Sequence, residues 1–169
     1  PEWAHDFSAL RRGAIQLALT RAGDDPALAD AALEVFFAER QRVDFFADAL
    51  PALEYLSSRY PLVALSNVNA DVQRVGVGHF FHASVSAGDV GVAKPDARIF
   101  QRGAQAAGVA PEQVLHIGDD AHLDGVGALE VGMQMAWVHR AGPVWQHALH
   151  MPQITVSELR AVCARPGTV

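Results

Sequence analysis

Cysteine is almost absent from this sequence of 169 residues, in which Cys163 is the only one. A single cysteine excludes an internal disulfide and a cysteine-rich zinc site. It suits a reducing compartment, so we expect the protein in the cytoplasm. Cys163 lies within a helical pattern near the end of the sequence, where we expect it to pack against neighbouring apolar residues.

Long apolar runs and basic clusters are also missing. No stretch approaches the ~20 consecutive apolar residues of a membrane span. The formal net charge is −6, and no basic stripe is interleaved with aromatic residues. Neither a membrane nor a nucleic acid is therefore an expected partner. The sequence does not specify an oligomeric state.

Half of the residues are apolar, which is enough for one sizeable core. Apolar residues recur at helical spacing between Phe7 and Arg21, and Asp25 followed by Pro26 is typical of a helix N-terminus. No convincing strand precedes residue 49. We therefore predict a helical unit over residues 1–48 and an α/β unit over residues 49–169.

Short apolar runs alternate with helical patterns after Pro61. Helices are expected after Pro51, after Asp96 and around residues 70–75, with a last one over residues 157–163. Buried strands are expected at residues 62–65, 83–86, 114–117 and 133–138, the last of the core strands, and residues 154–156 are left unassigned. This alternation indicates an α/β fold with a doubly wound, Rossmann-like parallel sheet.

One stretch, VLHIGDDAHLD at residues 114–124, is unusually acidic. Its apolar run stops at Gly118, and Asp119, Asp120 and Asp124 follow. Carboxylates this close together repel one another unless a cation or hydrogen-bond donors hold them. One interpretation is a Mg2+ site. The alternative is a solvated acidic turn in which one aspartate caps the next helix.

Polar residues follow two other predicted segments. Ser66 and Asn67 come after the strand at residues 62–65, and Lys94 precedes the helix that Asp96 would cap. Because the carboxyl ends of parallel strands share one edge of a sheet, we expect these side chains to meet the acidic residues in one crevice. A hydroxyl, an amide, an ammonium and an acidic metal site together can hold a phosphate dianion. The expected partner is a small-molecule phosphate ester.

Three stretches resemble motifs of the haloacid dehalogenase superfamily. LVALSNVNADV is similar to its second motif, GVAKPDARIF to its third, and HIGDDAHLDGVGALEVGM to its fourth. The resemblance covers essentially the whole chain and is strongest to bacterial flavin mononucleotide and ribityl-phosphate phosphatases. These enzymes carry a helical cap between the first and second motifs. The resemblance implies that residues 1–48 are the later part of such a cap.

The resemblance also implies a role for each residue of the phosphate site. Ser66 and Lys94 would be catalytic: Ser66 would bind the transferring phosphoryl group, and Lys94 would stabilise charge on the nucleophile and the phosphate. Asn67 would bind substrate beside them. The implied activity is Mg2+-dependent hydrolysis of a small phosphorylated metabolite, of the FMN or sugar or ribityl phosphate type, through an aspartyl-phosphate.

The implied cofactor is Mg2+, held by the acidic stretch. Asp119 would be a direct ligand, whereas Asp120 and Asp124 would act in or near the metal's shell or orient Lys94. The metal-free haloacid dehalogenases of the superfamily do not have this acidic pair, so the resemblance favours the phosphatases.

The superfamily's first motif, D-x-D-x-T or a close variant, does not occur after a strand in this sequence. That motif supplies the aspartate nucleophile, without which an aspartyl-phosphate cannot form. We therefore expect the chain to be the C-terminal part of a longer protein, to lack the first strand of the core, and to be inactive by itself. The alternative is a non-catalytic phosphate-binding or interaction domain of the same fold.

Overall fold

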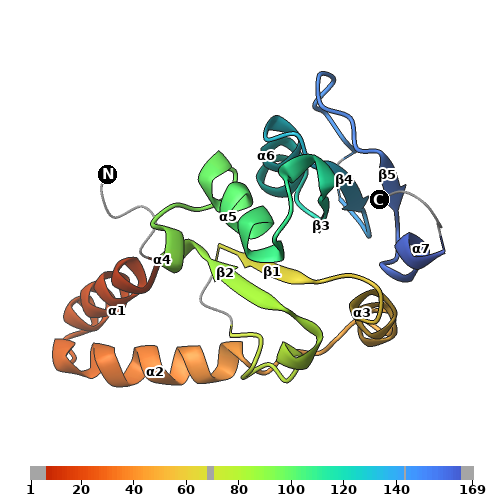
Figure 1. Cartoon of the computed structure of the whole chain (residues 1–169). Coiled ribbons are helices and arrows are strands. Elements are labelled where there is room, and N and C mark those ends of the chain that lie inside the picture. Colours follow the sequence, from red (N-terminus) through yellow and green to blue (C-terminus); the bar gives the residue numbers. More distant parts are fainter. Residues whose placement is uncertain (1–6, 68–70, 143, 165–169) are drawn as a thin grey trace.

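The computed structural model describes residues 7–67, 71–142 and 144–164 (Figure 1). Strands alternate with helices along most of this length, and every strand pairs in parallel with its neighbour. The predicted α/β class is confirmed. None of the helices in these ranges is long and apolar enough to cross a membrane.

A pair of helices precedes the first strand. α1 (Phe7–Ala22) and α2 (Ala29–Arg40) are joined through the 3-10 turn η1 (Pro26–Leu28). The Asp25 side chain accepts a hydrogen bond from the Ala27 N–H, which confirms the predicted N-cap. Figure 1 shows this helix pair at one end of the molecule, away from β3 and β4. The described part of residues 1–48 is thus free of strands, while the division at residue 48 stays a prediction.

All four predicted strands are present, with ends displaced by at most one residue, and residues 154–156 form a further strand that was not predicted. The elements after α2 are, in chain order, α3 (Ala49–Ser57), β1 (Val63–Ser66), η2 (Gly78–Phe80), β2 (Ala83–Ser86), α4 (Ala87–Val90), α5 (Ala97–Ala107), η3 (Pro111–Gln113), β3 (Leu115–Gly118), η4 (Ala121–Val126), α6 (Gly127–Glu130), β4 (Gln134–Val138), β5 (Ile154–Val156) and α7 (Arg160–Cys163).

Two helix predictions were wrong in part. Residues 72–76 form turns instead of a helix, and residue 70 lies outside the described residues. A single bond from the Val75 N–H to the Asp71 carbonyl spans one helical turn, and Gly76 then ends the segment at a φ of 91°. The last helix, α7, is also shorter than expected and begins at Arg160.

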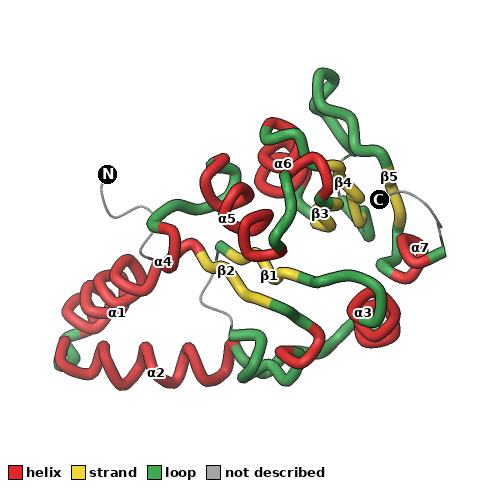
Figure 2. Tube along the Cα trace, in the orientation of Figure 1, coloured by secondary structure: helices red, strands yellow, loops and turns green. Residues whose placement is uncertain are grey.

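The strands form two separate parallel sheets. β1 pairs with β2, and β3, β4 and β5 pair in that order. Figure 2 shows the two groups of strands. All residues of β1 and of β3 are half-buried, whereas four of the five residues of β4, which has neighbours on both sides, are buried. No strand from the described part of the chain pairs with the second edge of β1 or of β3.

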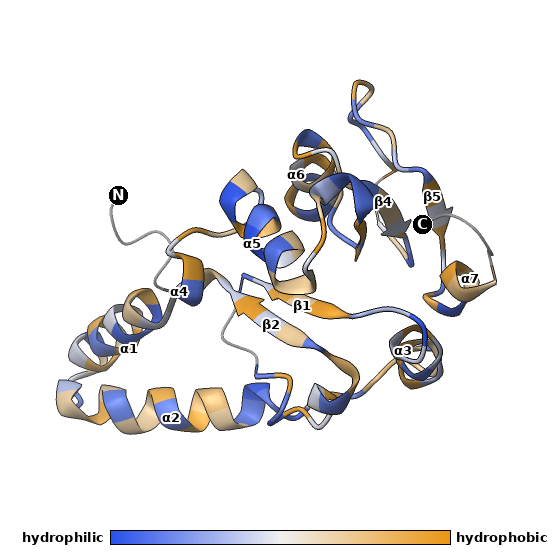
Figure 3. Ribbon diagram, viewed as in Figure 1, coloured by the Kyte–Doolittle hydropathy of each residue, from blue (hydrophilic) through white to orange (hydrophobic). Residues whose placement is uncertain are grey.

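Helix α5 covers the first sheet and links it to the second. Its Ile99 and Phe100 are fully buried against β1, β2 and α6. In Figure 3 much of β1 and β2 has the colour of hydrophobic residues. The Phe100 ring meets the edge of the His116 ring in β3, with centroids 5.2 Å apart. Gly127 in α6 approaches the Phe100 ring so closely that a Cβ atom would overlap it.

A buried carboxylate ties the segment before α3 to the last part of the chain. The side chain of Asp48 is 7% exposed. Both of its oxygens accept hydrogen bonds from Arg140, at 2.8 and 2.9 Å, and one also accepts from the Leu159 N–H. The Arg140 guanidinium lies over the Phe46 ring, 4.1 Å from its centroid. Three segments that are distant in sequence therefore converge on Asp48.

The single cysteine lies where α7 meets α3. Cys163 is half-buried, and its Sγ lies 4.0 Å from the Ala52 carbonyl oxygen. Burial raises the pKa of the Cys163 thiol. A protonated, partly buried thiol packs as a small apolar side chain, as the sequence predicts.

Candidate active site

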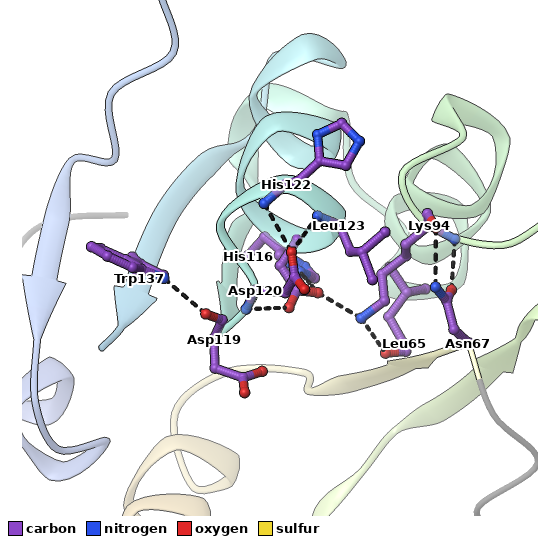
Figure 4. A network of polar contacts seen from close by, with 10 residues as sticks. Leu65, Asn67, Lys94, His116, Asp119, Asp120, His122, Leu123 and Trp137 are labelled. Carbon is purple, nitrogen blue, oxygen red and sulfur yellow. Dashed lines mark hydrogen bonds and ion pairs between the residues drawn. The ribbon is translucent and has the colours of Figure 1, made fainter. Parts of the chain in front are cut away.

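Lys94 lies between α4 and α5, just before the helix that Asp96 caps. It is the only lysine in the sequence. Its Nζ donates to Asp124 Oδ1 at 2.6 Å and to the Leu65 carbonyl oxygen, in β1, at 3.3 Å (Figure 4). The side chains of Lys94 and Asp124 are only 13% and 7% exposed. Because little water screens it, this ion pair is stronger than a surface pair.

Both oxygens of Asp124 are engaged. Oδ1 contacts Lys94 and lies 3.2 Å from His116 Nε2, and Oδ2 accepts from the Asp120 N–H at 3.1 Å. Burial alone would raise the pKa of Asp124, but the hydrogen bond from His116 and the charge of Lys94 outweigh it and hold that pKa well below its ordinary value. Asp124 is therefore a negatively charged counter-ion for Lys94 at neutral pH.

Glycine at position 118 allows the Asp124 carboxylate to lie close to the end of β3. Gly118 ends β3, and a side chain there would overlap the carboxyl group of Asp124. The turn after β3 can thus fold back onto η4, a π-helix of six residues. The sequence predicts Gly118 as the point where the chain turns, and the structure adds that the missing Cβ leaves room for Asp124.

Asp120 caps the helix that follows it. Its Oδ1 accepts hydrogen bonds from the His122 N–H at 2.9 Å and the Leu123 N–H at 2.7 Å. The interpretation in which one aspartate of the acidic stretch caps the next helix is confirmed for Asp120. One oxygen of this carboxylate is thereby committed to the backbone.

Asp119 is exposed and directly follows β3. Its carbonyl oxygen accepts a hydrogen bond from Trp137 Nε1 at 2.9 Å. Figure 4 shows its carboxylate directed away from Asp120 and from His122. Among the hydrogen bonds within the described ranges, none reaches the Asp119 carboxylate, so its oxygens are available to a ligand.

The acidic stretch by itself does not form a complete metal centre. Across the described ranges, no group of three or more His, Cys, Asp or Glu side chains is placed to hold a metal ion. Asp124 is occupied by Lys94, and Asp120 caps η4. Mg2+ takes six oxygen ligands, commonly several waters with one or two carboxylates and substrate phosphates. Asp119 fits one such position, and the others would require oxygens from elsewhere.

Asn67 is bound to the backbone of Lys94. The Lys94 N–H donates to Asn67 Oδ1 at 2.6 Å, and Asn67 Nδ2 donates to the Lys94 carbonyl oxygen at 3.0 Å. Ser66, the last residue of β1, is half-buried next to it. Residues 68–70, which belong to the stretch resembling the second motif, lie outside the described residues.

The structure brings Asn67, Lys94 and Asp124 into contact, and Figure 4 shows Asp119 and Asp120 near this group. Nothing in the sequence indicates that His116 and Trp137 belong to this group. His116 and Trp137 are predicted only as parts of the strands at residues 114–117 and 133–138. Their contacts depend on strand pairing: β3 and β4 are adjacent, and Gly118 lies opposite Trp137.

Comparison with known proteins identifies a family and several similar hydrolases. A model of the haloacid dehalogenase-like hydrolases matches residues 2–132. The 5-amino-6-(5-phospho-D-ribitylamino)uracil phosphatase YigB of Escherichia coli is 31% identical over 96% of this chain and 71% of its own length. The phosphoserine phosphatase of Thermus thermophilus is 34% identical over 95% of this chain and 65% of its own length.

A crystal structure of a 2-haloacid dehalogenase from Pseudomonas syringae pv. tomato has a TM-score of 0.87 and 34% identity to this chain. The match covers 96% of this chain and 72% of that one. The three motifs resembling this superfamily, the lysine and aspartate that they place in contact, and the family match lead to one conclusion: the chain belongs to the haloacid dehalogenase-like hydrolases.

Proposed function

We propose that this hydrolase is a Mg2+-dependent phosphatase of a small phosphorylated metabolite. The observation that carries the proposal is the Lys94 ammonium, held at 2.6 Å from Asp124 in η4 and at 3.3 Å from the Leu65 carbonyl oxygen in β1. A fixed positive charge of low exposure stabilises negative charge that develops on a phosphoryl group. The single cysteine supports the cytoplasm as its compartment.

The other predicted residues surround this charge. The Ser66 hydroxyl would donate to a phosphoryl oxygen, and Asp119 would hold the metal through its available carboxylate. Mg2+, when bound, would neutralise charge on the phosphoryl oxygens. Asp124 would act through Lys94, and Asp120 through the backbone of η4 that it caps.

An aspartyl-phosphate route needs a carboxylate nucleophile that we do not assign to any described residue. We propose that a further segment of a longer polypeptide supplies it, as a parallel strand between β1 and β3. Two observations support this proposal. Both strands are half-buried at every position and have one edge with which no described strand pairs, and the chain spans 71% and 65% of the lengths of the two phosphatase relatives.

The names of the relatives favour phosphate monoesters of small metabolites as substrates. They include a phosphorylated ribitylaminouracil, phosphoserine and glyceraldehyde 3-phosphate. We propose a ribityl or sugar phosphate, or FMN, as the first substrates to examine. The structural match to a 2-haloacid dehalogenase supports a second candidate, hydrolytic dehalogenation of a small 2-haloacid.

One experiment separates these possibilities. Phosphate and halide release would be measured with para-nitrophenyl phosphate, FMN, phosphoserine and 2-chloropropionate, with Mg2+ and with a chelator. The samples are this chain and the same chain extended to the upstream start codon. We expect Mg2+-dependent phosphate release from the extended protein alone, lost in Asp119→Ala and kept in Asp30→Ala, a change on exposed α2.

Each other outcome has a definite meaning. Halide release without phosphate release would establish the dehalogenase. If both proteins are folded by circular dichroism and release neither product, the non-catalytic phosphate-binding domain becomes the better explanation.

A further inference from the structure

We propose that Asn67 is a positioning residue that holds the backbone of Lys94. The proposal rests on the proposed function, in which Lys94 stabilises phosphoryl charge. Residue 67 is otherwise predicted to bind substrate. Its carboxamide oxygen and an N–H donor are instead engaged with a single residue, through bonds of 2.6 and 3.0 Å to the Lys94 N–H and carbonyl oxygen.

The pairing also fixes the orientation of the carboxamide. A backbone N–H can donate only to the amide oxygen, and a backbone carbonyl can accept only from the amide nitrogen. Exchanging the two ends of Asn67 would place donor against donor and acceptor against acceptor. The observed orientation is therefore the only one that satisfies both backbone groups of Lys94.

Lys94 lies in the loop between α4 and α5, so its backbone belongs to no described helix or strand. Within the described residues, the backbone N–H and carbonyl of Lys94 form hydrogen bonds with Asn67 alone. The next residue is Pro95, which has no N–H to donate. Asn67 thus provides the pair of bonds that a neighbouring strand would provide in a sheet.

The contact joins both ends of the lysine to β1. Asn67 follows the last residue of β1 and holds the Lys94 backbone, while Leu65 in β1 accepts from Lys94 Nζ. Asp124, in η4 after β3, accepts from the same Nζ. If the hydrogen bonds from Asn67 are removed, the Lys94 backbone can move, and the position of the Lys94 ammonium then varies with it. A misplacement of about 1 Å in a catalytic group can cost roughly 100-fold in rate.

The lysine content of the chain allows a direct test. Because Lys94 is the only lysine, an amine-reactive acetylating reagent modifies that side chain and the terminal amine alone. Trypsin does not readily cut before proline, so peptide 75–98 carries Lys94 and no other lysine. The labelling rate of that peptide, measured by mass spectrometry, reports how often Nζ leaves its partners.

The variants are Asn67→Ala, which removes both bonds, and Asn67→Asp, which keeps an acceptor for the Lys94 N–H and loses the donor. The matched control is Gln153→Ala. Gln153 Oε1 accepts from the Met135 N–H at 2.7 Å, which is the same kind of side-chain-to-backbone bond in the other sheet. Circular dichroism and thermal unfolding would show that each variant is folded at the labelling temperature.

We expect Asn67→Ala to raise the labelling rate roughly tenfold or more, Asn67→Asp to raise it less, and Gln153→Ala to leave it unchanged. An unchanged rate in folded Asn67→Ala would overturn the proposal. If Asn67→Ala does not fold, Asn67→Asp decides: a raised rate supports the proposal, and the wild-type rate refutes it.

Kinetics of the extended protein separate positioning from substrate binding. A positioning role predicts that Asn67→Ala lowers kcat with KM nearly unchanged, together with faster labelling. A raised KM with unchanged kcat and unchanged labelling would show that Asn67 binds substrate. If labelling rises and no substrate is turned over by any protein, the positioning of Lys94 stands and the proposed function fails.

Discussion

The Lys94 ammonium and the Asp124 carboxylate lie 2.6 Å apart with side-chain exposures of only 13% and 7%. Neither charge can regain full hydration if its partner is removed. The cost of breaking such a pair is therefore larger than the net value of forming it.

We expect Lys94→Met and Asp124→Asn each to lower the free energy of unfolding by about 3 kcal/mol, since each leaves one group of the pair without its charged partner. The double variant should lose less than the sum of the two, because no uncompensated charge remains. Urea unfolding of the four proteins measures this coupling. Arg12→Ala, which breaks the exposed pair with Asp30, is the control and should change stability little. Additive losses in the double variant would show that the two side chains do not interact.

Because the pKa of Asp124 is lowered in the folded chain, the free energy of unfolding should depend on pH. A carboxyl whose pKa is lower in the folded than in the unfolded chain stabilises the fold above its unfolded pKa, and this stability is lost as the pH falls. The same direction holds for Asp48, mainly through the hydrogen bond from Arg140, and for Asp96, whose pKa the Arg98 hydrogen bond lowers to about 2.

We therefore expect the free energy of unfolding to decrease between roughly pH 4 and pH 2. The decrease should be shallower in Asp124→Asn, which has no carboxyl to protonate at that position. Thermal unfolding across this pH range measures both slopes. Equal slopes for the wild type and Asp124→Asn would mean that the carboxyl has the same pKa in the folded and unfolded chain.

The contact between Asp48 and Arg140 should stabilise the junction of three segments. Arg140→Ala would remove both side-chain hydrogen bonds of the buried Asp48 and leave it backbone donors such as the Leu159 N–H, and it should cost about 2 kcal/mol. Arg160→Ala is the matched control, because Arg160 pairs with Glu158 at the surface, where the side chains are 71% and 48% exposed. Chemical denaturation compares them, and a loss in Arg160→Ala as large as in Arg140→Ala would contradict the prediction.

Two glycine substitutions in helices should have opposite effects. Gly127→Ala places a methyl group against the buried Phe100 ring, and we expect it to destabilise the fold by about 2 kcal/mol. Gly13→Ala in α1 meets no atom within 4 Å, and alanine favours helix, so it should stabilise the fold by roughly 0.5–1 kcal/mol. Thermal melts of both variants test the pair. Destabilisation by Gly13→Ala would show that α1 is packed differently.

The strands and helix ends were predictable because their causes are local. Asp96 accepts from the Arg98 N–H as an N-cap, and Gly108 ends α5 in the left-handed conformation, as their positions in the sequence indicate. The turn at residues 72–76 was not predictable, since a weak helical pattern of this length is too short to form a helix without packing.

The different contacts made by Asp119, Asp120 and Asp124 were not predictable either. Their spacing suggests one shared metal site, yet Asp120 is bound by nearby backbone groups and Asp124 by Lys94, 30 residues away in sequence. Spacing places carboxylates near one another. Which donors reach each of them depends on how α5, η4 and β1 come together.

The unpaired edges of β1 and β3 have a practical consequence for handling the protein. Each presents backbone N–H and carbonyl groups that can template a strand from another molecule. At high concentration, copies of this chain would compete to add strands to one another. A short, extended peptide supplied in excess should pair with these edges and suppress that self-association. Turbidity measured with and without a series of peptides would then show which peptide sequences bind the edges of β1 and β3.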